Sequence, residues 1–213
     1  MKTINDGWFF RKASTENWQP VNVPHTYNLD AYSQRNYYMG KAFYQKSFVL
    51  PEVPQGKRCF LKIDAASKAA DLTLNGQKIA ANSAFTFDIT PYIQKNNTIE
   101  IKVDNSRKDI TPISADFTFW GGIYRDVWLI TTSEQHFNLL NHGSDGIFIS
   151  TPHVDEKEAT IEIRSEITND ATEKATLEVI HQIYDPQGKL QQTLKQHLPV
   201  KAGETQTVRK TPA

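Results

Sequence analysis

Hydrophobic and polar residues alternate along most of the chain with a period of two. Residues 98–104 place three β-branched apolar side chains on one side of the segment and four polar ones on the other. Residues 160–167 repeat the pattern, with isoleucines at positions 161, 163 and 167 opposite charged side chains. Such alternation is typical of strands with one buried and one solvated face. Further strands are predicted at residues 7–12, 43–50, 58–64, 71–74, 85–89, 124–131, 177–184, 190–197 and 205–209. No window of helical length shows a convincing 3.6-residue period, so the chain is predicted to be all-β.

Turn residues separate these strands. Asn75-Gly76 is typical of a type I′ hairpin turn, which needs positive φ at both central positions. Asp185-Pro186-Gln187-Gly188 predicts a second turn, with proline pre-setting φ and glycine closing it. The polar stretch 136–146 is rich in residues that break strands, and we place the domain boundary there. The predicted domains are 1–135 and 136–213.

The two predicted domains differ in aromatic content and in completeness. All four tryptophans, at positions 8, 18, 120 and 128, lie in the first domain. Aromatic side chains suit both a filled core and a surface that stacks on sugar rings, and we favour the core interpretation. The second domain offers about five strands, whereas an immunoglobulin-like sandwich uses about seven. We therefore expect an incomplete sandwich with an unpaired edge and uncovered apolar faces, which favour partner association or local disorder.

Composition excludes several classes of function. The chain has 24 Lys and Arg against 24 Asp and Glu, so no overall charge steers it toward nucleic acid or an anionic membrane. Cys59 is the single cysteine, which excludes an internal disulfide and thiolate-rich metal sites, and we expect it in the core. No apolar stretch approaches the roughly 20 residues of a membrane-spanning helix, and the N-terminus lacks a signal-peptide segment. A soluble chain is expected; the compartment stays open, periplasmic or secreted if a signal was removed from the parent.

Several short motifs, in order along the chain, resemble one protein family. They are Val-Pro-His-Thr at 23–26, Met-Gly-Lys-Ala-Phe-Tyr at 39–44, Leu-Asn-Gly at 74–76, Phe-Thr-Phe-Asp-Ile-Thr-Pro-Tyr-Ile at 85–93 and Ile-Lys-Val-Asp-Asn at 101–105. The most specific is the signature segment, residues 120–129, which reads Trp-Gly-Gly-Ile-Tyr-Arg-Asp-Val-Trp-Leu. Together these motifs resemble the sugar-binding domain of glycoside hydrolase family 2. The likeness covers residues 4–131 and continues more generically beyond residue 146, where it implies a strand at residues 147–152.

The resemblance implies a fold and an activity. Family members, which include β-galactosidases, β-glucuronidases and β-mannosidases, carry a jelly-roll domain, an immunoglobulin-like domain and a (β/α)8 barrel. The implied fold here is a galactose-binding-like jelly-roll β-sandwich followed by a truncated immunoglobulin-like one. Retaining chemistry requires two carboxyl groups about 5–5.5 Å apart at the ends of barrel strands. Because this chain has no alternation of strands with long helices, we expect no catalytic residue and no cofactor in it.

The resemblance also implies roles for individual residues. Asp116 stands where family relatives place an acidic residue that binds substrate hydroxyls, and a carboxylate suits this task because it accepts charge-assisted hydrogen bonds. Asn36 and Tyr37 lie in a loop that contributes to the pocket in some members. Structural roles are expected for the signature residues His25, Asn105, Trp120, Gly121, Gly122 and Arg125. Asp104, Asn105 and Asp109 lack calcium-loop spacing and are interpreted as turn formers, so no metal site is predicted.

Two functions fit these observations. In the first, the chain is the non-catalytic N-terminal part of a retaining exo-glycosidase. It supports a C-terminal catalytic barrel and adds contacts to a β-galactoside-type carbohydrate. We favour a β-galactosidase as the parent, with β-glucuronidase and β-mannosidase as alternatives. In the second, the chain is an independent carbohydrate-binding module. An adhesion or assembly protein is a third, less favoured interpretation. Sugar specificity and oligomeric state, including a homo-oligomer, stay open.

Overall fold

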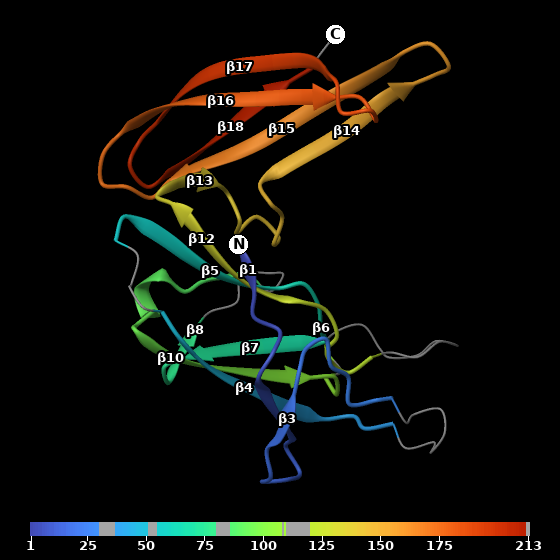
Figure 1. Ribbon diagram of the computed structural model, residues 1–213, viewed down its shortest axis with the longest axis vertical. Coiled ribbons are helices and arrows are strands. Elements are labelled where there is room, and N and C mark those ends of the chain that lie inside the picture. The colour runs from blue at the N-terminus through green and yellow to red at the C-terminus, as the bar shows by residue number, and fades with distance from the viewer. Residues whose placement is uncertain (30–36, 51–54, 80–85, 108, 110–119, 212–213) are drawn as a thin grey trace. The chain divides into compact units, whose positions relative to one another are not determined.

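The computed structural model describes residues 1–29, 37–50, 55–79, 86–107, 109 and 120–211 (Figure 1). It consists of two compact units, Met1–Thr131 and Thr132–Ala213, which are described separately. Within the described ranges the regular structure is strand, apart from one 3-10 turn, η1 (Thr90–Tyr92). This agrees with the all-β prediction. That part of the chain has no helix with the length and apolar character needed to span a membrane.

The first unit is built from antiparallel strands in three sheets. Its strands are β1 (Lys2–Thr3), β2 (Trp8–Lys12), β3 (Gln19–Val21), β4 (Lys41–Val49), β5 (Lys57–Ile63), β6 (Ala66–Ser67), β7 (Ala69–Leu74), β8 (Gln77–Ile79), β9 (Thr86–Asp88), β10 (Asn96–Asp104), β11 (Gly122–Ile123) and β12 (Val127–Ser133). A six-stranded sheet has the order β3-β2-β4-β10-β7-β8, a four-stranded sheet the order β1-β12-β5-β9, and β11 pairs with β6. Strands that pair in the larger sheet can lie far apart in sequence. For example, β4 pairs with β2 on one side and with β10 on the other.

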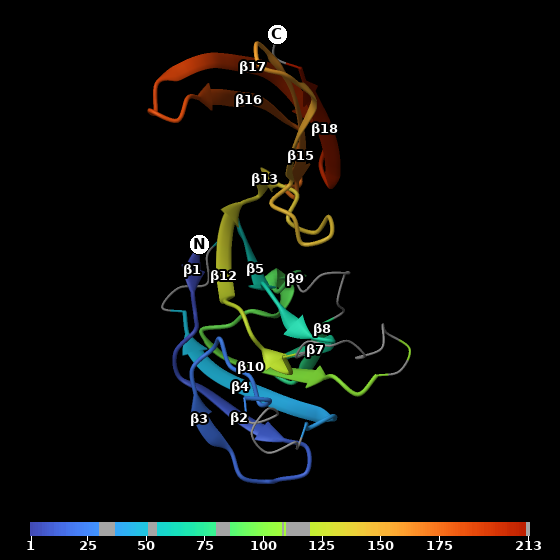
Figure 2. The same ribbon diagram turned by 90° about the vertical axis from the view of Figure 1, so that its right-hand side faces the viewer.

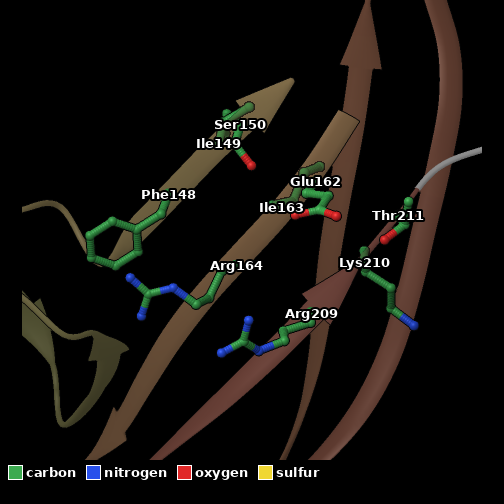
Figure 3. A pocket seen from close by; sticks show the side chains of 9 residues that line it. All are labelled: Phe148, Ile149, Ser150, Glu162, Ile163, Arg164, Arg209, Lys210 and Thr211. Atoms are coloured by element: carbon green, nitrogen blue, oxygen red, sulfur yellow. The ribbon is translucent and has the colours of Figure 1, made fainter. Parts of the chain in front are cut away.

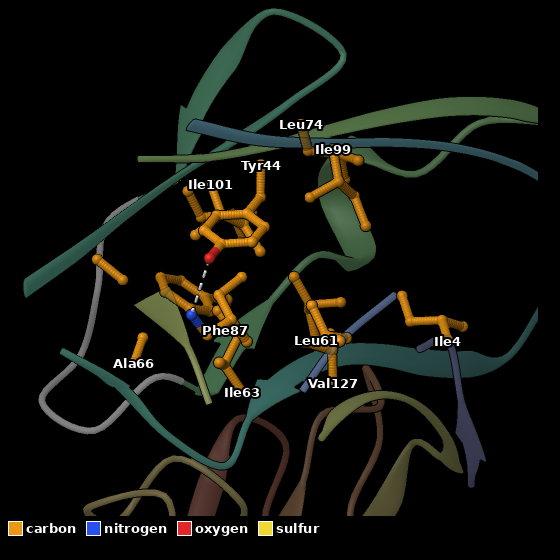
Figure 4. Packing of buried hydrophobic residues seen from close by; sticks show 14 of the residues in the cluster. Ile4, Tyr44, Leu61, Ile63, Ala66, Leu74, Phe87, Ile99, Ile101 and Val127 are labelled. Carbon is orange, nitrogen blue, oxygen red and sulfur yellow. Dashed lines mark hydrogen bonds between the residues drawn. The ribbon is translucent and has the colours of Figure 1, made fainter. Parts of the chain in front are cut away.

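The core of the first unit lies between its two larger sheets. Figure 4 shows Tyr44, Leu74, Ile99 and Ile101, from the six-stranded sheet, facing Leu61, Phe87 and Val127 from the four-stranded one. Trp8, Leu61 and Ile101 are fully buried, and Cys59 joins the same cluster as predicted. Each fully buried large aliphatic side chain contributes roughly 1.5–3 kcal/mol, so this packing is what orders the sandwich and the loops at its rim.

The second unit contains two sheets. Its strands are β13 (Gln135–Phe137), β14 (Ile147–Val154), β15 (Ala159–Asn169), β16 (Ala175–Tyr184), β17 (Leu190–Val200) and β18 (Glu204–Lys210). β15 pairs with β13, β14 and β18, while β16 pairs with β17 (Figure 2). The small core between the sheets is formed by Ile167, Val179, Leu198, Val200 and Val208.

The apolar face of the second unit is only partly covered. Ile149 of β14 is the register partner of Ile163 on β15, so both lie on the same face of the sheet. Ile163 is 6% exposed, whereas Ile149 is 68% exposed. The sheet of β16 and β17 has just these two strands within the described residues. This is the open sandwich with uncovered apolar surface that the strand count predicts.

Differences from the sequence prediction concern short strands. The alternating pattern does not mark β1, β6 and β11, which have two residues each, or β3, which contains Pro20. β13 lies at Gln135–Phe137, so the first two residues of the stretch 136–146, where we placed the domain boundary, belong to a strand. The two hairpin turns are confirmed: Asn75 and Gly76 both have positive φ, and the amide of Gly188 donates to the carbonyl of Asp185 at 2.9 Å.

Candidate functional site

An open cleft at the surface of the first unit is formed by two segments that are far apart in sequence. We call it the aromatic cleft, and its volume is about 450 Å³. It is lined by Pro24, His25, Thr26 and Leu29 from the first segment and by Trp120, Tyr124 and Arg125 from the second. Both segments carry motifs noted in the sequence, which makes the cleft the meeting point of those motifs.

Backbone hydrogen bonds hold the two segments together. The amide of His25 donates to the carbonyl of Ile123 at 2.7 Å, and the amide of Tyr27 donates to the carbonyl of Gly121 at 3.3 Å. This close approach requires glycine at position 122, where φ is +108°. A Cβ atom there would overlap the hydroxyl oxygen of Tyr44 and lie 2.7 Å from the carbonyl oxygen of His25. The expected structural role of Gly122 therefore has a steric basis.

A chain of amide hydrogen bonds fixes the loops beside the cleft. The buried Asn28 accepts a hydrogen bond from the amide of Gly121 at 2.8 Å and donates to the carbonyl of Tyr38 at 3.2 Å. Asn105, also buried, donates to the same carbonyl at 3.1 Å and accepts from the amide of Gly40 at 2.8 Å. Asn105 thus joins two backbone groups of the loop at residues 38–40. Asn28 was not expected from the sequence, since an asparagine in a loop carries no local signal.

The inner wall of the cleft is neutral. His25 Nδ1 lies 2.8 Å from the hydroxyl oxygen of Tyr44, and the His25 ring packs 4.6 Å from the ring of Phe10, centroid to centroid. Burial lowers the pKa of His25 and raises the pKa values of Tyr27 and Tyr44. These groups therefore resist gaining or losing a proton near neutral pH, and they serve to position the wall. His25 is partly buried and hydrogen-bonded in its loop.

Apolar and aromatic side chains form the accessible part of the cleft. Leu29 is 70% exposed, Trp120 43% and Tyr124 38%. The core interpretation of the tryptophans is right for Trp8, which is fully buried, and wrong for Trp120. Arg125 is exposed and makes no hydrogen bond or ion pair with any described residue, so the structural role expected for it is not seen there. Flat apolar rings beside a free guanidinium can stack on a sugar ring and bind its oxygen atoms.

The predicted substrate-binding residues are described only in part. Tyr37 is described and hydrogen-bonds to Asn105; burial raises its pKa more than this hydrogen bond lowers it. Tyr37 does not line the aromatic cleft. Asn36 and Asp116 lie outside the described residues.

One group of side chains in the described ranges could hold a metal ion. His153, Asp155 and Glu158, all exposed on the turn between β14 and β15, bring ligand atoms within 4.8 Å of one another. Asp155 Oδ1 already accepts hydrogen bonds from the amides of Lys157 and Glu158, which accounts for its position without an ion. Asp104 accepts from the amide of Ser106, and Asp109 pairs with Arg107, which fits their interpretation as turn residues.

Comparison with known proteins places the chain in a family. Residues 3–133 match the family described as glycosyl hydrolases family 2, sugar binding domain. A β-glucuronidase of Bacteroides fragilis is 31% identical over 189 residues, which are 83% of this chain and 27% of that protein. The crystal structure of a β-glucuronidase of Bacteroides uniformis is 46% identical, with a TM-score of 0.90 over 100% of this chain and 27% of that one. A putative β-galactosidase of B. fragilis is 26% identical, with a TM-score of 0.89 over 99% and 34%.

The fold and the family match thus define a β-sandwich domain of the sugar-binding class. The chain belongs to glycoside hydrolase family 2, as the motifs implied. It spans 22% to 27% of the length of the curated β-glucuronidases that it matches.

The histidine of the cleft gives the first unit a defined pH response. The ordinary pKa of histidine is 6.5, and burial lowers that of His25. The unfolded chain therefore takes up the proton first as the pH falls, which favours unfolding. We expect the free energy of unfolding to decrease between about pH 7.5 and about pH 5.5. Urea denaturation followed by tryptophan fluorescence measures this in the first unit alone, because all four tryptophans and no histidine other than His25 lie there. A His25→Gln variant that keeps the same decrease would contradict the assignment.

Proposed function

We propose that this chain is the non-catalytic N-terminal part of a longer family 2 glycosidase of the β-glucuronidase type. The observation that carries the proposal is the 46% identity, over the full chain, to a protein of which the chain spans 27% and which is named a β-glucuronidase. β-Galactosidases are among the relatives too, at 24% to 30% identity. We therefore choose the β-glucuronidase alternative over the β-galactosidase that the motifs alone favoured.

In this proposal the catalytic groups lie in another part of the parent protein. A retaining glycosidase needs a general acid/base carboxyl and a nucleophilic carboxylate about 5–5.5 Å apart. The described lining of the aromatic cleft offers rings, a neutral histidine and a guanidinium instead. These groups can bind and orient a sugar ring. The partner of the chain is then a catalytic (β/α)8 barrel, supported by the two sandwiches.

Substrate contacts are proposed at the aromatic cleft and in the loops beside it. Trp120 and Tyr124 would stack on a sugar ring of the substrate, and Arg125 would bind its oxygen atoms or a carboxylate. Asp116, Asn36 and Tyr37 stay proposed contacts on the basis of the family resemblance. The hydrogen bond between Tyr37 and Asn105 would keep that loop in place.

The proposal is tested by the sequence that follows residue 213 in the gene and by the activity of the whole product. We expect a barrel with two catalytic carboxylates, and hydrolysis of p-nitrophenyl β-D-glucuronide in preference to the β-D-galactoside. The isolated 213-residue chain should hydrolyse neither compound. A reversed preference would restore the β-galactosidase interpretation, and hydrolysis by the isolated chain would end the proposal.

Removing the exposed indole of the cleft should weaken substrate binding in the whole enzyme. We expect Trp120→Ala to raise KM for an aryl glycoside about tenfold and to change kcat little, because a stacked ring contributes binding more than chemistry. Phe9→Ala is the matched control, since Phe9 is 47% exposed on β2 and does not line the cleft. Equal KM values for the two variants would exclude the cleft from substrate binding.

An independent carbohydrate-binding module is the second candidate, and the exposed rings of the cleft favour it specifically. Isothermal titration calorimetry of the isolated chain with β-glucuronides and β-galactosides separates the two. A module that acts alone binds in the millimolar range or more tightly. A domain that only completes the pocket of a barrel shows no heat of binding.

A further inference from the structure

A small polar pocket lies on the second unit, over β14, β15 and β18 (Figure 3). Its volume is about 260 Å³. Ile163 and Ile167 of β15 face the core of this unit, so Glu162 and Arg164, which alternate with them, face outward. The polar side chains that line the pocket are Ser150, Glu162, Arg164, Arg209, Lys210 and Thr211.

Two arginines stand directly opposite each other in this pocket. Arg164 of β15 and Arg209 of β18 are register partners in the antiparallel pair, and Figure 3 shows their guanidinium groups on the same side of the sheet. Like charges directly opposite each other across two strands are destabilising. The placement therefore costs the fold free energy wherever the two charges are not balanced by other groups.

The two arginines differ in how their charges are balanced. Arg164 stacks over the ring of Phe148, 3.8 Å from its centroid, and pairs with Glu166. Burial raises the pKa of Glu166, but hydrogen bonds from Asn141 and Asn138, together with Arg164, outweigh burial and lower it. Glu166 therefore stays ionised, and its negative charge balances the positive charge of Arg164. Arg209 is exposed and has no hydrogen bond or ion pair with any described residue.

We propose that the Arg164–Arg209 pair is a binding site for the carboxylate of a uronic acid residue in an acidic oligosaccharide. A guanidinium offers two N–H donors in a fork that matches the two oxygens of a carboxylate, and Arg209 has this fork unused among the described residues, with the charge of Arg164 beside it. The bound anion would relieve the repulsion within the pair. Glu162 and Ser150, at the other end of the pocket, can accept and donate hydrogen bonds to sugar hydroxyls.

The size of the pocket favours a sugar acid over an acidic protein. The pocket of about 260 Å³ is lined by nine residues and has room for one sugar residue, whereas a stable protein interface uses roughly 20–30 residues on each side. The choice of a uronic acid rests on the proposed function, because a β-glucuronidase meets such residues in its substrates. The preference for an anion follows from the arginine pair alone.

Nuclear magnetic resonance titration of the full 213-residue chain tests the site, with sodium D-glucuronate as the probe and D-glucose as its neutral counterpart. We expect the Nε–H resonance of Arg209 to shift with glucuronate, with saturation in the millimolar range, and not with glucose. Arg209→Gln should weaken glucuronate binding at least about tenfold, since a charge-assisted pair of hydrogen bonds is lost. Lys201→Gln removes one positive charge from an exposed side chain outside the pocket and should leave binding unchanged.

Three results would overturn the site. The first is no shift with glucuronate, and the second is an equal loss of binding in both variants, which would indicate unspecific charge attraction. The third is tighter binding of a tetraglutamate peptide than of glucuronate, which would indicate an acidic protein partner. If the whole enzyme hydrolyses glucuronides while its N-terminal chain shows any of these results, the pocket is wrong and the proposed function stands.

Discussion

The variant Gly122→Ala is expected to lower the free energy of unfolding of the first unit by about 3–5 kcal/mol. Two costs add together at this position. Its φ of +108° lies in the region that disfavours residues with a Cβ atom. The new methyl group would also collide with the hydroxyl of Tyr44 and the backbone carbonyl of His25. Neither can move away, because Tyr44 is fully buried and the His25 amide is bonded to Ile123.

Chemical denaturation followed by tryptophan fluorescence measures this loss. Gly76→Ala is the matched control, since Gly76 also has a positive φ, +79°, but no heavy atom lies within 4 Å of the place that its new methyl group would occupy. It should lose only about 1 kcal/mol, the cost of the backbone conformation alone. If the two variants lose the same free energy, the close approach of the signature segment to residues 24–29 is not what requires the glycine.

The variant Asn105→Ala is expected to lower the free energy of unfolding by about 2–4 kcal/mol. It removes a fully buried side chain that satisfies the amide of Gly40 and the carbonyl of Tyr38 and also hydrogen-bonds to Tyr37. The Gly40 amide would lose this acceptor, while the Tyr38 carbonyl would keep its bond from Asn28. The Gly40 amide is partly buried, and a donor shielded from water without a partner costs more than the hydrogen bond gained in folding.

Two further variants make this test specific. Asn105→Asp keeps an acceptor for the Gly40 amide but loses the donor to the Tyr38 carbonyl. Because it also places a carboxylate at a buried position, its loss of stability includes the cost of burying a charge. Asn96→Ala removes an exposed asparagine at the start of β10 and should change the stability by less than about 0.5 kcal/mol. An Asn105→Ala variant as stable as Asn96→Ala would show that the loops beside the cleft are held by other contacts.

Period-two alternation predicted the long strands because it reports burial on one face directly. β10 and β15, the clearest patterns in the sequence, are long strands that contribute to the cores of their units. Strands of two or three residues are too short to show a period, which is why β6 and β11 were missed although they bring Gly122 into place.

The candidate site was predicted as a set of residues and not as an arrangement. His25, Gly122 and Arg125 were singled out through motifs, but the pairing of residues 24–29 with the signature segment is a tertiary contact across about 100 positions, for which no local pattern exists. The exposure of Trp120 could not be predicted for the same reason, because alternation does not say which face another segment covers. Asn28 fits this explanation too, since its partners are distant backbone groups.

Strand β15 has a special position in the second unit. β13, β14 and β18 each pair with β15 through backbone hydrogen bonds, and the described residues show no other strand pairing for those three. Unfolding of β15 would therefore break every strand pair of that sheet, whereas unfolding of β14 alone would leave β15 and β18 paired. Amide hydrogen exchange should accordingly be slowest along the centre of β15 and fastest along the outer edge of β14, so that this half of the molecule unfolds from its rim toward a single central strand.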